Sequence, residues 1–201
     1  MHKIFIFFLL ILFCFACSKE NIKKSSINEK SLDLQVIEAY EEAMKSLNEG
    51  DVLFAAKKFN EAEIMFPQSP WAPKSALMAA YSYYSQDYYL DCIQELKRFV
   101  KVYPNHKHIS YAYYLLGISY YEQIVDEKKD LESIINAKET FKILNNKYPN
   151  TEYSLDAEFK LDLIDDILAA KEIYIAKYYI QPKKWIPAIT RLKVVVNDYA
   201  E

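Results

Sequence analysis

Four stretches of this chain share one pattern of apolar residues. Within each stretch, these residues are spaced three or four positions apart. That spacing places them on one face of an α-helix. The stretches end in an aromatic residue, followed by proline in the first three: Phe66-Pro67, Tyr103-Pro104, Tyr148-Pro149 and Tyr199. Each face carries a small residue at the same distance before its end: Ala55, Cys92, Ala137 and Ala188. Because proline cannot continue a helix and disfavours helical geometry in the residue before it, the aromatic–proline pairs are predicted to end helices.

A second apolar face precedes these predicted helices. Tyr81-Ser82-Tyr83-Tyr84 aligns with Ile118-Ser119-Tyr120-Tyr121, and Ala80 then aligns with Gly117. Each unit is therefore predicted to be a helix, a short turn and a second helix, in which small residues let the two helices approach closely. The predicted helices cover residues 34–48, 51–66, 71–86, 88–103, 108–124, 130–148, 151–180 and 184–199.

This layout is typical of tetratricopeptide repeats, which stack helical hairpins into a solenoid. The predicted fold is all-α, a tetratricopeptide-repeat solenoid of about four helical hairpins and about eight helices. The repeat domain is predicted over residues 34–201, with units at about 34–67, 68–104, 105–149 and 150–201. An exposed charged loop lengthens the third unit, and the long first helix of the fourth unit is expected to protrude past its neighbours.

The N-terminal segment is predicted to be a secretory signal of the bacterial lipoprotein kind. A short basic start is followed by an apolar run from Ile4 to Ala16, and the small residue Ala16 directly precedes Cys17, as in such signals. Residues 1–16 would be removed, and Cys17 would carry a covalent lipid. The polar and charged residues 17–33 would then form a flexible tether.

The residue after the acylated cysteine influences the membrane to which a lipoprotein is delivered. Ser18 at this place favours delivery to the outer membrane, with the folded domain in the periplasm. Lipoprotein signals usually carry leucine where this chain has Cys14. An ordinary cleaved signal peptide and an uncleaved anchor therefore remain alternatives.

Composition supports helices and argues against nucleic acid as a partner. The chain has only two glycines in 201 residues, whereas sheets and phosphate-binding loops depend on glycine for tight turns. A net charge of −3 gives no electrostatic reason to bind nucleic acid. Cys92 is the single cysteine of the predicted folded part, so no intramolecular disulfide is expected there.

No set of residues suggests catalysis or a metal site. His106 and His108 form a His-x-His pair without a nearby Cys, Asp or Glu at the spacing of a structural metal site, so they are interpreted as a solvated turn. Asp162, Asp165 and Asp166 share one helical face and are interpreted as an exposed acidic surface. The chain is therefore predicted to be no enzyme and to need no cofactor beyond the lipid on Cys17.

Stacked hairpins present a concave groove lined by their first helices. The residues predicted to face it are apolar or aromatic: Tyr40, Met44, Leu47, Leu77, Tyr81, Tyr84, Tyr114, Ile118 and Tyr121. Such a surface suits an extended peptide that carries aromatic side chains. The alternative for each single tyrosine is packing between the repeats.

The mature chain resembles the BamD family, the lipoproteins of the bacterial outer-membrane β-barrel assembly machinery. The likeness covers residues 17–201 and is most specific near the end of the chain. Its main motifs are Cys17-Ser18, Tyr40-Glu41-Glu42-Ala43, Gly50-Asp51, Phe66-Pro67-Gln68-Ser69-Pro70-Trp71-Ala72, Tyr111-Ala112-Tyr113-Tyr114-Leu115-Leu116-Gly117, Ile175-Ala176-Lys177-Tyr178-Tyr179 and Asp198-Tyr199.

The resemblance implies an adaptor in outer-membrane protein insertion. The family's N-terminal repeats are associated with the C-terminal signals of unfolded outer-membrane proteins, and Tyr81, Tyr84 and Tyr114 match that groove. Its C-terminal repeats dock the barrel protein BamA and accessory lipoproteins. The residues that match the docking surface are Glu172, Lys177, Tyr178, Trp185 and Arg191. Family members usually carry a fifth repeat, whereas this sequence ends at Glu201, just after the fourth unit.

A second interpretation stays open at this point. The same features fit a tetratricopeptide-repeat lipoprotein that serves as a scaffold in another envelope or cell-wall assembly. Co-purification with the barrel protein would distinguish the two.

Overall fold

The computed structural model describes residues 31–124 and 131–199, and this part of the chain is all helical with no strand. Cys17, the predicted signal and most of the tether, and the loop at 125–130 lie outside the described residues. The helices are α2 (Leu32–Asn48), α3 (Val52–Met65), α4 (Trp71–Tyr84), α5 (Tyr89–Val102), α6 (Ile109–Tyr121), α7 (Leu131–Lys147), α8 (Glu152–Ile180) and α9 (Trp185–Asp198).

The predicted helices are confirmed, with ends that differ by no more than a few residues. Local side chains explain several starts. The Asp51 carboxylate accepts a hydrogen bond from the Phe54 N–H at 3.1 Å, and Thr151 and Ser154 cap the start of α8 reciprocally. These groups satisfy N–H donors that the first turn of a helix leaves without partners. The prolines after Phe66 and Tyr103 end α3 and α5 as predicted.

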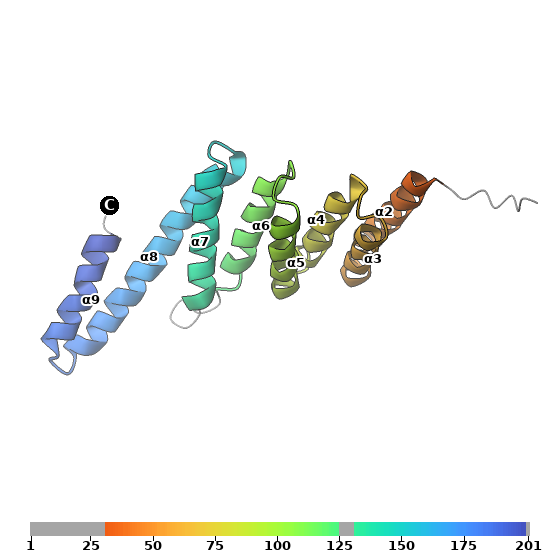
Figure 1. Ribbon diagram of the computed structural model, residues 1–201. Helices are drawn as coiled ribbons and strands as arrows, with labels where there is room; N and C mark the ends of the chain where they lie inside the picture. Colours follow the sequence, from red (N-terminus) through yellow and green to blue (C-terminus); the bar gives the residue numbers. More distant parts are fainter. Residues whose placement is uncertain (1–30, 125–130, 200–201) are drawn as a thin grey trace, which may run out of the picture. The chain divides into compact units, whose positions relative to one another are not determined.

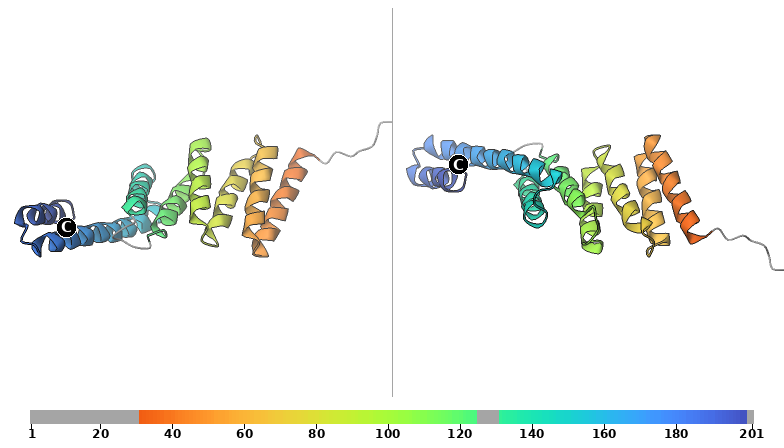
Figure 2. Two further views of the ribbon diagram at one scale, coloured as in Figure 1. Left: turned by 90° about the horizontal axis from the view of Figure 1, so that it is seen from below. Right: turned by 90° about the horizontal axis from the view of Figure 1, so that it is seen from above.

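Consecutive helices pack as hairpins, α2 with α3, α4 with α5, α6 with α7 and α8 with α9. Neighbouring hairpins join through α3 with α4, α5 with α6 and α7 with α8, so that the pairs follow one another in chain order (Figures 1 and 2). The all-α repeat fold predicted from the sequence is therefore confirmed.

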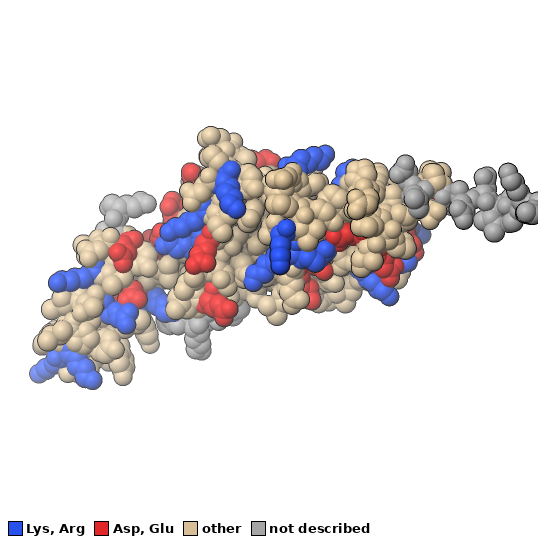
Figure 3. All heavy atoms as spheres, viewed as in Figure 1, with Lys and Arg blue, Asp and Glu red and all other residues tan. Residues whose placement is uncertain are grey.

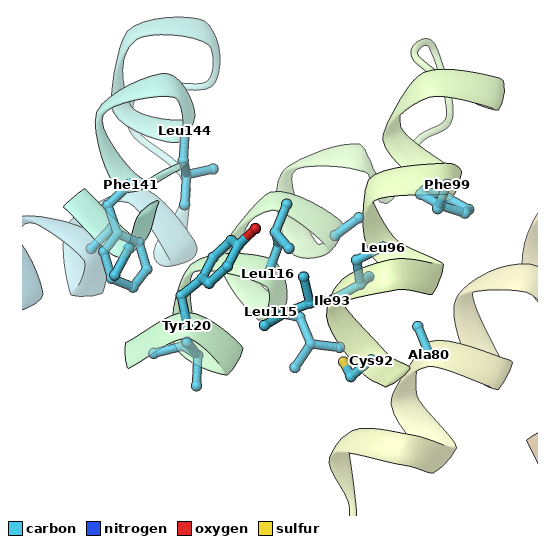
Figure 4. Packing of buried hydrophobic residues seen from close by; sticks show 14 of the residues in the cluster. Ala80, Cys92, Ile93, Leu96, Phe99, Leu115, Leu116, Tyr120, Phe141 and Leu144 are labelled. Atoms are coloured by element: carbon cyan, nitrogen blue, oxygen red, sulfur yellow. The ribbon is translucent and has the colours of Figure 1, made fainter. Parts of the chain in front are cut away.

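The core lies at these joins and forms two clusters of buried apolar side chains. Its larger cluster draws on α4 to α8 and includes Leu96, Phe99, Leu116, Phe141 and Leu144, which Figure 4 shows from close by. A smaller cluster joins α2, α3 and α4. The small residues predicted from the repeat are all buried: Ala55, Cys92, Ala137 and Ala188.

The fourth hairpin departs from the repeat pattern in one respect. The large apolar side chains of α9 are mostly left uncovered: Trp185 is 56% exposed and Leu192 is also exposed. Only Ala188 of this helix is buried. The reason is that α9 packs chiefly against α8, and no described helix covers its other side. Within the described residues, no helix has the length and apolar character needed to cross a membrane.

Candidate peptide-binding groove

A cavity of about 310 Å³ opens where the first helices of three hairpins meet. It is lined by Leu77, Met78 and Tyr81 of α4, by His108 and Tyr111 at the start of α6, and by Tyr153 at the start of α8. A volume of this size lies at the low end of the range for ligand pockets. All but one of its lining side chains are apolar or aromatic, and none is acidic.

Tyrosines from α6 and α8 form one wall of this cavity. The ring of Tyr153 lies 5.4 Å from the ring of Tyr111 and 5.4 Å from that of Tyr114, measured between centroids. The Tyr114 hydroxyl donates a hydrogen bond to Asp156 at 2.8 Å, which ties α6 to α8. Burial raises the pKa of Tyr111 to about 12, so this hydroxyl stays protonated and can donate or accept a hydrogen bond.

The structure brings part of the predicted groove together. Leu77 and Tyr81 line the cavity directly. Tyr114 lies beside it through its contact with Tyr153, and Tyr84 packs against the same core cluster. Ile118 is buried in that cluster and does not line the cavity.

The remaining predicted groove residues lie elsewhere. The Tyr40 ring packs between Phe59 and Trp71, at centroid distances of 5.2 and 5.0 Å. Met44 and Leu47 pack against the same small cluster of α2, α3 and α4. The Tyr121 ring is covered by the ammonium of Lys160, 4.9 Å from its centroid. For Tyr40 the structure thus shows packing between repeats, the alternative that the sequence left open.

Four lining residues were not predicted to face the groove: Met78, His108, Tyr111 and Tyr153. Tyr111 lies one helical turn before Tyr114, so the helical period was the signal that could have found it. His108 was interpreted as part of a solvated turn; it is exposed, but its side chain lines the cavity. Tyr153 could not be found from its own unit, because only the stacking of hairpins brings α8 to α4.

A second cavity, of about 520 Å³, lies between α3 and α5 and holds a closed polar network. Arg98 donates two hydrogen bonds to the Glu63 carboxylate, at 2.8 and 2.7 Å, and two more to Glu95. Tyr103 donates to Glu63 at 2.7 Å. The Glu63 carboxylate raises the pKa of Arg98 further. Because these groups satisfy one another, the network is best explained as a tie between two repeats.

The predicted docking residues lie on the last hairpin. Arg191 of α9 pairs with Glu172 of α8 at 3.1 Å and so joins the two helices. Lys177, Tyr178 and Trp185 are exposed. Positive and negative side chains are interspersed over the face seen in Figure 3, without a large field of one sign.

No group of three or more His, Cys, Asp and Glu side chains is placed to hold a metal ion in the part of the chain that the structure describes. The one cysteine described there, Cys92, is buried among core residues, with its sulfur 3.3 Å from the Ser119 hydroxyl.

Comparison with known proteins places the chain in a family. The sequence profile of the family described as "YfiO: Outer membrane lipoprotein" matches residues 32–201. A protein of Caulobacter vibrioides named "Outer membrane protein assembly factor BamD" is 36% identical over 160 residues, which are 80% of this chain and 52% of that protein. A protein of the same name from Rickettsia prowazekii is 35% identical, covering 76% of this chain and 63% of the relative.

A further protein of that name, from Neisseria gonorrhoeae, is 29% identical over 83% of this chain and 66% of its own length. The chain thus spans about half to two thirds of the length of these curated relatives. The resemblance to BamD predicted from the sequence motifs is confirmed. The family match covers every described residue but Ser31, and the chain belongs to the YfiO family of outer membrane lipoproteins.

Proposed function

We propose that this chain is a non-catalytic lipoprotein adaptor that helps to recognise unfolded outer-membrane proteins and to insert them into the outer membrane. Its relatives bear the name of outer membrane protein assembly factor. The observation that carries the proposal is the aromatic cavity between α4, α6 and α8. It provides an open apolar surface on the helices that tetratricopeptide repeats use to bind peptides.

The chemistry of the cavity favours a peptide with aromatic side chains. Leu77 and Met78 provide flexible apolar contacts, and the tyrosines provide rings with a hydroxyl at one end. Transferring one phenylalanine side chain from water into such a cavity contributes about 1.5–3 kcal/mol. The tyrosine hydroxyls can then orient the backbone of an extended segment by hydrogen bonds. The C-terminal signals of unfolded outer-membrane proteins fit this requirement.

Two further parts of the chain complete the proposed adaptor. A lipid on Cys17 would hold the protein at the outer membrane, with the repeats in the periplasm. The exposed side chains of the last hairpin, including Lys177, Tyr178 and Trp185, would dock BamA and accessory lipoproteins. Holding the substrate and the insertion machine on one scaffold raises the effective concentration of one near the other.

The first experiment is a pulldown of the tagged full chain from detergent-solubilised outer membranes, with the recovered proteins identified by mass spectrometry. BamA is expected among them, and a Cys17→Ala variant is expected to lose its attachment to the membrane. Recovery of other envelope proteins without BamA would contradict the proposal and would favour the alternative scaffold.

Photo-crosslinking tests the cavity itself. A benzoylphenylalanine at Tyr81, which is 38% exposed and lines the cavity, is expected to crosslink to unfolded outer-membrane protein. The matched control is the same probe at Tyr88, which is 40% exposed and lies outside the cavity. Equal crosslinking at both positions would argue against a specific groove.

A further inference from the structure

Basic side chains gather at one end of the aromatic cavity. His108 lines it, and the ring of His106 lies 5.5 Å from that of His108 between centroids. Lys74 lies on α4 one turn before Leu77, so it shares the face of that helix from which Leu77 and Tyr81 line the cavity. Its ammonium lies 4.2 Å from the centroid of the Trp71 ring, a contact that leaves the positive charge in place.

The basic side chains lie close enough together for their charges to change the pKa of His106. Burial lowers the pKa of His106, and the charges of His108, Lys107 and Lys74 lower it further. No acidic side chain lines the cavity, and neither lysine forms an ion pair with a carboxylate among the described residues. The nearby carboxylate of Asp156 accepts a hydrogen bond from Tyr114 on the side of α8. The lowered pKa of His106 favours its neutral form, so the positive charge near this end comes from Lys74 and Lys107. Glu152 beside Tyr153 is a second carboxylate on the side of α8.

The backbone at the same place adds hydrogen-bond donors. His108 is the residue that precedes the first turn of α6, a helix of 13 residues, and no side chain caps that turn. The first N–H groups of a helix lack partners within the helix and carry a partial positive charge. The Ile109 N–H donates to the His106 carbonyl at 2.9 Å, so the donors that remain without a described partner are the N–H groups of Ser110 and Tyr111, beside the cavity-lining His108 and Tyr111. A small anion at this end would meet side-chain cations and backbone donors together.

Resting on the proposed function, we infer that this groove recognises the free C-terminal carboxylate of its peptide. The last side chain, an aromatic one, fills the cavity between Leu77, Tyr81 and Tyr153. The terminal carboxylate then lies at the basic end, against His108, Lys74 and the uncapped start of α6. An internal segment of the same sequence would place a neutral peptide group there, which lacks the charge. The groove thus distinguishes the end of a chain from its interior.

Three peptides of about ten residues, labelled with fluorescein at the N-terminus, test this inference on the full chain. The first ends in phenylalanine with a free carboxylate, and the second is its C-terminal amide. The third carries two glycines after the phenylalanine, which move the carboxylate away from the ring. Fluorescence anisotropy gives the Kd of each. The free acid is expected to bind about tenfold or more tighter than the other two, because charge-assisted hydrogen bonds are the stronger ones.

Variants then assign the effect to the basic end. The double substitution Lys74→Gln and His108→Gln is expected to bring the affinity for the free acid down to that for the amide. Lys101→Gln is the matched control, because Lys101 is an exposed lysine of α5 that lies outside the cavity. It is expected to leave the difference between acid and amide unchanged. Circular dichroism verifies that each variant is folded.

The outcomes separate this inference from the proposed function. If all three peptides bind with one Kd, the inference is wrong, while the proposal of an aromatic peptide groove stands. If none of them binds the wild-type chain, the peptide groove fails together with the inference. The comparison of acid with amide on the wild-type chain needs no variant, so misfolding of a variant would not hide the answer.

Discussion

Close approach between helices in this protein depends on single small residues. Gly117 lies in α6 directly against Phe141 of α7, whose side chain is fully buried. A Cβ atom at Gly117 would lie 2.6 Å from Cδ1 of that ring and closer still to Cε1. Ala80 takes the corresponding place in α4, and it is buried as well. The repeat pattern thus marks a position that always holds a small residue. The side chain that faces it determines whether alanine fits or only glycine does.

We expect Gly117→Ala to lower the stability of the chain. Alanine favours a helix interior over glycine by about 1 kcal/mol, whereas one extra methyl group against a packed ring costs about 1–3 kcal/mol. The Phe141 ring is fully buried and three of its atoms would meet the new methyl group, so the second effect should prevail. Urea unfolding followed by circular dichroism measures the difference. An unchanged or higher midpoint would show that α6 and α7 move apart at little cost.

The thiol of Cys92 illustrates how burial controls reactivity. Burial raises its pKa to about 11, against the smaller opposite effect of the Ser119 hydrogen bond. The thiolate is the reactive form, so little of it exists at pH 8. Iodoacetamide is therefore expected to modify Cys92 slowly in the folded chain and rapidly in urea, as measured by mass spectrometry of its peptide. Equal rates in both states would contradict the packing described for this site.

Pairs of helices are joined by more than apolar contacts. Glu63 of α3 has a side chain only 8% exposed, and it is held by Arg98 of α5, whose side chain is 39% exposed. The two residues belong to neighbouring hairpins, so their contact fixes one repeat against the next. A buried charge without its partner is costly, which makes this pair sensitive to the loss of one member.

Arg98→Met is expected to cost about 2–3 kcal/mol of unfolding free energy. The value lies below that for a fully buried pair because Arg98 is partly exposed to water. In the double variant Glu63→Gln and Arg98→Met the most buried carboxylate, that of Glu63, is gone, and the new amide oxygen would still accept from Tyr103. Glu95, 20% exposed, loses Arg98 but keeps a hydrogen bond from Asn60, so part of the loss should be recovered. Urea unfolding of both variants gives the two free energies. Lys101→Met, an exposed control on α5, should change little.

If the double variant were as unstable as Arg98→Met alone, the uncompensated charge of Glu63 would not be the cause. The loss would then come from the packing of the Arg98 side chain or from the Glu95 carboxylate, which loses the same partner.

At the scale of the whole chain, the last hairpin differs from the other three. Its second helix, α9, exposes apolar side chains that repeat along one face, among them Trp185, Ile189, Leu192 and Val196. Ile186 is 81% exposed. The corresponding helix of each earlier hairpin lies against the next unit. Under the proposed function this surface would contact BamA or an accessory lipoprotein.

The double substitution Ile186→Lys and Ile189→Lys tests that role. Exposed side chains contribute little to folding, so the unfolding free energy should change by no more than about 0.5 kcal/mol. Recovery of BamA in the pulldown should fall, because two ammonium groups would have to lose water on docking. Leu90→Lys on α5 is the control, since Leu90 is equally apolar and exposed but lies on another hairpin. Undiminished recovery of BamA would exclude this face of α9 from docking.

The sequence by itself determined the eight helices of the described part of the chain, their ends to within a few residues and their small contact residues. Such features are local: the helical period, the proline after Phe66 or Tyr103 and the capping groups act within a few residues. The resemblance to BamD likewise came from motifs that the chain carries in order. Cys17 and its lipid remain a prediction, because that residue lies outside the described part of the chain.

Only the tertiary structure decided where the groove lies and which aromatic residues face it. Tyr40 and Leu77 occupy the same place in their units, three residues before Ala43 and Ala80, but Tyr40 packs against Phe59 and Trp71 while Leu77 lines a cavity. That cavity needs residues of α4, α6 and α8 together, and it brings His108 beside Tyr81. The separation between these residues along the chain is large, and their distance in space depends on how each hairpin stacks on the next. No periodicity within one helix contains that information.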